Sequence, residues 1–182
     1  MARPTTQLVS LLRQTANRIA DAKTRYQWSS FAHCNCGHLA QTLTGMDPSE
    51  IEQKRGAQAG DWGQQARDLA APHVRFHPDF GDRPALDEGA WEPENIGSCS
   101  VSGRPLDELF EQLYEVGLSP QDIGHLERLS DPAVRRHLGA NTIRFNCFER
   151  QNVVRYMRAW ASILEEQLLA EHPQATIFAA AE

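Results

Sequence analysis

Apolar residues recur at helical spacing along much of the chain, most clearly near its two ends. Leu8, Leu12, Ala16 and Ile19 repeat at intervals of three or four positions. This spacing places them on one face of a helix, and it predicts a helix over residues 5–23. A second stripe predicts a long helix that starts near Asn146 and runs to about 171. Its apolar positions are Val153, Met157, Trp160, Ala161, Leu164 and Leu168.

Capping signals predict shorter helices between these two. Asp47–Pro48, Ser119–Pro120 and Asp131–Pro132 each place an N-cap residue before a proline at the first helical position. Further short helices are expected over 36–44, 61–70 and 105–116. No internal repeat is visible. We therefore predict an all-α fold, an irregular helical bundle of roughly six to eight helices that forms one domain over residues 1–182.

Residues 72–97 interrupt the helical pattern. Prolines and glycines are spread through them, and six acidic residues between positions 79 and 94 stand against Arg83. Loops of this length are uncommon in compact domains. We expect a long acidic Pro/Gly-rich loop here, either a solvated insertion or a lid or partner-binding segment. Residues 174–182 are expected to form a mobile tail or a docked arm.

Composition and charge narrow the class of protein. The chain has 182 residues, 41% of them apolar, which favours a folded domain over a disordered chain. The net charge is −6 and argues against a nucleic-acid partner, because phosphate binding needs concentrated Lys and Arg. No apolar run is long enough to span a membrane, and no secretory signal is visible at the N-terminus. We expect a cytoplasmic protein.

The hexapeptide HCNCGH, residues 33–38, is the densest group of chemically active side chains. Cys34 and Cys36 are two residues apart, so on a helix they would point in nearly opposite directions. At a helix start both thiols can converge on one ion. With Asn35 as N-cap and Cys36 as the first helical residue, the helix dipole would favour thiolate over thiol.

The two remaining cysteines repeat this placement at distant positions. Cys147 follows Asn146, the expected cap of the last helix, and Cys99 lies in a small-residue turn before the 105–116 helix. Zinc takes four Cys or three Cys and one His, and iron–sulfur clusters take four Cys. We predict a structural or redox site for Zn²⁺, or for an iron–sulfur cluster, in a protein with a regulatory or binding role. Its ligands would be Cys34, Cys36 and Cys99, with Cys147 or His38 as the fourth.

Two other interpretations of HCNCGH remain open. Cys34 or Cys36 could be a reactive thiol flanked by His33 and His38, as in a cysteine-dependent enzyme or a redox sensor. Alternatively, the cysteines are small residues of a capping turn and the histidines are surface groups. The residues therefore leave open whether the chain is an enzyme, and the expected partner is a protein or a small molecule.

Residues 117–138 resemble, loosely, a helix-turn-helix DNA-binding unit. The turn would lie at Leu129, and Arg135 and Arg136 on the second helix could face phosphate or base edges. The segment departs from that pattern at Glu127, an expected apolar position, and at Arg128, an expected turn glycine. The resemblance implies a DNA-binding regulator. The alternative is a pair of capped helices packed in a bundle.

Arginines crowd the first half of the predicted last helix. The side chains involved are Arg144, Arg150, Arg155 and Arg158. Positive charge near a helix N-terminus opposes the helix dipole. We therefore expect these arginines to have partners, either the acidic 79–94 segment or an acidic ligand, unless they form a solvated face.

Overall fold

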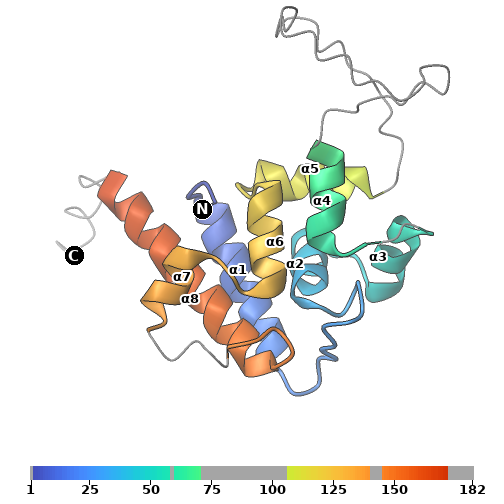
Figure 1. The fold of residues 1–182 in the computed structure, drawn as a ribbon, viewed down its shortest axis with the longest axis horizontal. Helices are drawn as coiled ribbons and strands as arrows, with labels where there is room; N and C mark the ends of the chain where they lie inside the picture. The colour runs from blue at the N-terminus through green and yellow to red at the C-terminus, as the bar shows by residue number, and fades with distance from the viewer. Residues whose placement is uncertain (1, 58–59, 71–105, 140–144, 172–182) are drawn as a thin grey trace, which may run out of the picture.

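The computed structural model of the chain describes residues 2–57, 60–70, 106–139 and 145–171. All regular structure in these ranges is helical, which confirms the predicted all-α bundle (Figure 1). The helices are α1 Thr6–Ala20, α2 Asn35–Thr44, α3 Pro48–Arg55, α4 Trp62–Ala70, α5 Asp107–Glu115, α6 Pro120–Arg128, α7 Pro132–His137 and α8 Arg150–Glu171. The predicted 72–97 loop and the 174–182 tail lie outside the described residues.

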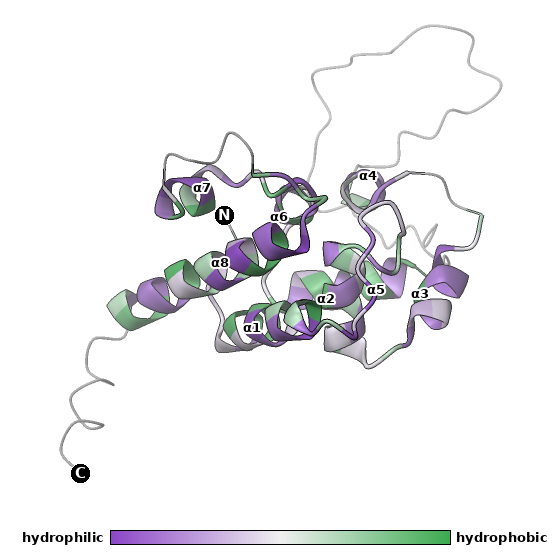
Figure 2. Ribbon diagram, turned by 90° about the horizontal axis from the view of Figure 1, so that it is seen from below, coloured by the Kyte–Doolittle hydropathy of each residue, from purple (hydrophilic) through white to green (hydrophobic). Residues whose placement is uncertain are grey.

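Helices α1 and α8 form an antiparallel pair along one side of the bundle (Figures 1 and 2). The direction follows from three contacts: Arg13 pairs with Glu165, Arg158 donates to Asn17 Oδ1, and Arg150 donates to the Asp21 carbonyl. The predicted apolar faces meet here and are buried, although Leu168 near the end of α8 is only partly buried. They contribute Leu8, Leu12, Ala16 and Ile19 from α1, and Val153, Met157, Trp160 and Leu164 from α8.

The arginines of α8 have partners other than those we expected. Arg150 donates to the carbonyls of Asp21 and Thr24, at 2.8 and 2.6 Å, just past the end of α1. Arg155 places its guanidinium carbon 5.7 Å from the centre of the Phe145 ring. These basic groups therefore hold neighbouring segments of the bundle together. The acidic segment proposed as their partner lies outside the described residues.

Three of the predicted capping residues, Asp47, Ser119 and Asp131, act as expected. Asp47 and Ser119 each form a capping box, with Glu50 and Asp122 respectively. The Asp131 carboxylate accepts hydrogen bonds from two backbone N–H groups at the start of α7. Since each cap satisfies donors that would otherwise be orphaned, these residues define where three of the short helices begin.

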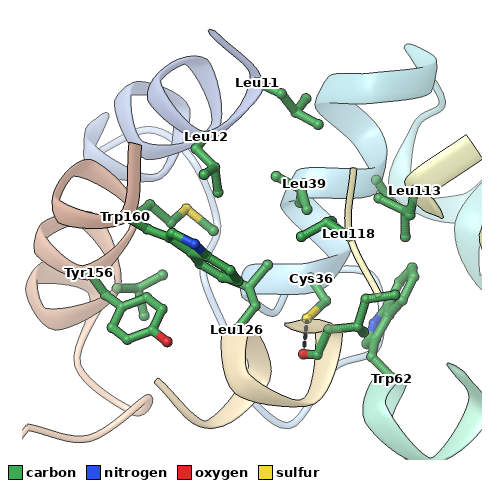
Figure 3. Packing of buried hydrophobic residues seen from close by; sticks show 14 of the residues in the cluster. Leu11, Leu12, Cys36, Leu39, Trp62, Leu113, Leu118, Leu126, Tyr156 and Trp160 are labelled. Carbon is green, nitrogen blue, oxygen red and sulfur yellow. Dashed lines mark hydrogen bonds between the residues drawn. The ribbon is translucent and has the colours of Figure 1, made fainter. Parts of the chain in front are cut away.

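Helix α2 occupies the middle of the bundle and contacts α1, α3, α5 and α6. Figure 3 shows Cys36 in the same apolar cluster as Leu39, Leu126 and Trp62. Helix α3, by contrast, lies at the edge and is mostly hydrophilic (Figure 2). Its one buried residue is Ile51. Among the described helices, none combines the length and the apolar character needed to cross a bilayer.

Candidate functional site

The HCNCGH segment begins α2, with its cap one residue earlier than predicted. Cys34, not Asn35, is the N-cap, and its sulfur accepts a hydrogen bond from Gly37 N at 3.4 Å. Asn35 is instead the first helical residue. Its side-chain amide is buried and donates to the carbonyls of Leu126 and Glu127 at the end of α6. The segment therefore joins α2 to α6.

A close backbone approach locks this segment together. A Cβ atom at Gly37 would lie 2.4 Å from the carbonyl oxygens of both Phe31 and Ala32. The same two carbonyls accept side-chain hydrogen bonds, from Trp62 Nε1 at 2.8 Å and from Gln41 Nε2 at 2.6 Å. Glycine is thus required at this position so that the 31–34 turn can pack on the first turn of α2.

Both cysteines of the segment are inside the core and remain thiols. Cys34 is 3% exposed and Cys36 is 2% exposed. Burial raises the pKa of Cys34 to about 12, although the Gly37 N–H group works in the opposite direction. Burial also raises the pKa of Cys36 well above its ordinary value. The predicted thiolate is wrong, because desolvation outweighs the helix dipole, and a reactive-thiol role for Cys34 or Cys36 loses its support.

The predicted metal-binding function is also wrong. Among the described residues, no group of three or more His, Cys, Asp or Glu side chains could hold a metal ion. Each thiol of the CxC pair faces a backbone carbonyl: Cys34 Sγ lies 3.3 Å from Phe31 O, and Cys36 Sγ lies 3.7 Å from Ile123 O. Cys99, the third ligand predicted for Zn²⁺ or an iron–sulfur cluster, lies outside the described residues.

The two candidates for the fourth ligand are engaged in the core as well. His38 is buried on α2 with Nε2 hydrogen-bonded to Arg25 O at 2.9 Å, and burial lowers its pKa to about 4. Cys147 is not the first residue of the last helix, since α8 begins at Arg150. Its carbonyl instead accepts a hydrogen bond from the hydroxyl group of Tyr26. Both residues therefore act as packing elements.

The helix-turn-helix interpretation of 117–138 gains no support from Arg135. The helices α6 and α7 are present and are joined through Leu129, which adopts a left-handed conformation with φ of 52°. The half-buried Arg135 guanidinium donates to the Phe145 carbonyl at 3.2 Å, and its Nε is buried. Arg135 is thus used to hold the segment before α8, whereas Arg136 is exposed.

Glu127, the residue of α6 that departs from the helix-turn-helix pattern, connects α6 to α4. Its buried carboxylate accepts hydrogen bonds from Trp62 N at 3.2 Å and Gly63 N at 3.1 Å. It therefore satisfies the first N–H groups of α4 from a neighbouring helix, where a negative charge is favoured by the dipole. A Cβ atom at Gly63 would lie 3.0 Å from Gly124 Cα, so α4 and α6 cross at a pair of glycines.

An open cleft of about 520 Å³ runs along α6 beside this crossing. Arg67 lines it from α4, and His125 and Arg128 line it from α6. The full lining is Arg67, Ser119, Pro120, Gln121, Gly124, His125, Arg128 and Ser130. This lining contains two guanidinium groups and an imidazole but no carboxylate, in a chain whose net charge is −6.

The two arginines of the cleft have exposed partners, and its histidine has a half-buried one. Arg128 Nη2 lies 3.0 Å from Asp61 Oδ2, and the two side chains are 54% and 40% exposed. Arg67 Nη2 donates to Gln64 Oε1 at 3.1 Å. His125 Nδ1 lies 2.8 Å from the Ser130 hydroxyl. Exposed ion pairs of this kind contribute about 0–1 kcal/mol, so a ligand can replace Asp61 at Arg128 at small cost.

A carboxyl pair lies directly behind the cleft. Burial raises the pKa of Glu127 to about 7, although the two backbone hydrogen bonds from α4 act to lower it. The nearby Asp61 carboxylate also raises the pKa of Glu127, through charge repulsion. Burial also acts on Asp61, but hydrogen bonds from Gln64 N and Arg128 outweigh it and lower its pKa. Arg128 is therefore shared between the cleft and this pair.

The sequence patterns did not predict this cleft. His125 and Arg128 are one helical turn apart, a spacing that places them on one face of α6, and that signal was available. Arg67 carried no such signal, because only the packing of α4 on α6 brings it opposite them. No protein family model, curated protein or solved structure matches this chain, so the function has to be argued from the cleft itself.

Proposed function

We propose that this chain is a binding protein for a small anionic ligand, a carboxylate, phosphate or sulfate group, held in the cleft between α4 and α6. The observation that carries the proposal is that Arg67 of α4 and Arg128 of α6 both line one cleft without a lining carboxylate. Guanidinium groups bind oxyanions with two parallel hydrogen bonds. Two of them from different helices can therefore hold one oxyanion between them.

The other cleft residues suit the same ligand. Gln121 and His125 supply an amide and an imidazole, and Ser130 supplies a hydroxyl, all groups that can donate to an oxygen. The N-terminal end of α6 also opens on the cleft at Pro120 and Gln121, and helix N-termini favour anions. The volume of about 520 Å³ falls in the range of ordinary small-molecule sites.

The test uses sulfate, whose charge does not change near neutral pH. Titration of the full chain with sulfate, followed by amide chemical shifts, should give saturable shifts at Gln121, Gly124 and Ser130. Chloride at matched ionic strength should not. Replacing either cleft arginine, in Arg67→Gln or Arg128→Gln, should weaken binding about tenfold or more, as expected for the loss of a charge-assisted pair.

Arg13→Gln is the matched control, because Arg13 is an exposed arginine paired with Glu165 outside the cleft. Its sulfate affinity should equal that of the unaltered chain. Sulfate also stabilises most folded proteins by exclusion from their surface. Equal, non-saturating responses in all four proteins would therefore show that general effect alone and overturn the proposal.

A further inference from the structure

The cleft and the buried carboxyl pair share one arginine. Arg128 lines the cleft and at the same time pairs with Asp61. Asp61 directly precedes Trp62, whose backbone N–H donates to the Glu127 carboxylate at 3.2 Å, so the two carboxyl groups are neighbours. The second cleft arginine approaches the same pair: Arg67 Nη1 and Glu127 Oε2 would lie 3.3 and 3.1 Å from a Cβ atom placed on Gly63. An anion held by both arginines must therefore draw positive charge away from these carboxylates.

We propose that occupation of the cleft by an anion is coupled to the uptake of one proton by the Asp61–Glu127 carboxyl pair. The inference rests on the proposed function and names how that site is regulated. Before binding, Arg128 balances the charge of Asp61. When the anion engages Arg128, two carboxylates and an anion share the neighbourhood. A proton taken from solvent then lets the two carboxyl groups hydrogen-bond to each other with one negative charge instead of two.

The surroundings of Glu127 support this direction. Arg67 on α4 approaches the same space beside Gly63 as the Glu127 carboxylate. Arg128 follows Glu127 on its own helix, and both arginines line the cleft. The other titratable groups that act on Glu127 are Asp61 before α4, Cys34 and Cys36 at the start of α2, and Cys147 before α8. The three cysteines are neutral thiols with raised pKa values. They therefore cannot supply the positive charge that the two carboxylates lose when the anion engages the arginines.

Before the anion binds, the pKa of Glu127 is already close to neutral pH. Its pKa of about 7 means that a modest upward change moves a proton at neutral pH. For a rise of about one unit, linkage predicts an uptake of about half a proton per bound anion near pH 7.5. By the same linkage, the anion should bind up to about tenfold more tightly below the titration range than above it.

The experiment is sulfate calorimetry on the full chain in buffers of different ionisation enthalpy at one pH, which measures the protons taken up. His125 lines the same cleft, so variants at Glu127 and at His125 are compared. Glu127→Gln should bind sulfate but lack about half a proton of uptake relative to the unaltered chain. His125→Asn should retain that half proton.

Each outcome is decisive. Absence of saturable sulfate binding in the unaltered chain would remove the binding function itself, and the coupling with it. Binding with no net uptake, or uptake that Glu127→Gln leaves unchanged, would overturn the coupling and leave the binding function intact. If Glu127→Gln does not fold, an infrared difference spectrum of the unaltered chain decides instead. Sulfate should produce a new protonated-carboxyl band, and its absence would overturn the proposal.

Discussion

The start of α2 and the cleft between α4 and α6 show opposite uses of reactive side chains. The first region gathers two cysteines and two histidines in six residues, and folding buries Cys34, Cys36 and His38 among apolar groups in uncharged form. The second region is built from residues far apart in the chain, and it keeps its charges at the surface. A local concentration of chemically active residue types therefore marked a packing motif here, while the site depended on tertiary contacts.

Substitution of Gly37 should give the largest effect. In Gly37→Ala the new methyl group would meet two backbone carbonyls at 2.4 Å, and backbone cannot rotate away as a side chain can. We expect a loss of about 3 kcal/mol or more in the free energy of unfolding, or no folded protein.

Urea denaturation checks this expectation, with Gly45→Ala as the control. Gly45 also needs glycine, at φ 76°, but it has open space around its Cβ position, and its replacement should cost about 1 kcal/mol. Equal losses in the two variants would contradict the close approach that makes HCNCGH a packing motif.

The pH dependence of stability should have opposite signs in the two regions. His38 has its pKa lowered from 6.5 to about 4, so the folded state binds fewer protons than the unfolded state in this window. Its contribution is therefore lost as pH falls from about 6.5 to about 4. Glu127 has its pKa raised from 4.5 to about 7, so the folded state binds more protons. Its contribution is lost as pH rises from about 4.5 to about 7.

Unfolding measurements on His38→Gln and Glu127→Gln separate these two effects. Relative to the unaltered chain, His38→Gln should gain about 2–3 kcal/mol on acidification from roughly pH 7 to pH 4. Glu127→Gln should gain a similar amount as the pH rises from roughly 5 to 8. Parallel pH profiles for the two variants would show that the regions do not differ in this way.

A third and smaller effect tests whether the regions are independent. Cys36→Ala removes a buried sulfur, and should cost about 1–2 kcal/mol of stability. It should leave sulfate affinity unchanged, because Cys36 does not line the cleft. Arg128→Gln should show the reverse, with a stability change under about 1 kcal/mol and a large loss of affinity. A loss of sulfate binding in Cys36→Ala would connect the two regions.

The fold was readable from the sequence where one local signal was sufficient. The apolar stripes of α1 and α8 and the caps at Asp47, Ser119 and Asp131 each act within a few residues, and each appears as predicted. The predicted cap at Asn35 is displaced by one position because its amide satisfies carbonyls at the end of α6, about ninety residues away. That contact has no local signature.

The candidate site was not readable for the same reason. Ionisation of the cysteines depended on burial, which capping patterns do not report, and the helix dipole was the weaker influence. Glu127 looked like a poor fit to an apolar position of α6. Only the neighbouring N-terminus of α4 gives its carboxylate two donors. Polar side chains that break a helical pattern are thus informative when their partner lies on another helix.

The two glycines at the crossing of α4 and α6 differ in how far they can be replaced. A Cβ atom at Gly63 would lie 3.0 Å from Gly124 Cα, tighter than ordinary packing. Alanine at Gly124 would make ordinary contacts, 3.9 Å from Gly63 Cα and 3.5 Å from Arg67 Nη1, and would favour the helix by about 1 kcal/mol. Selection for thermal resistance would therefore act on Gly124 and leave Gly63 in place, so only one side of this crossing is open to stabilising change.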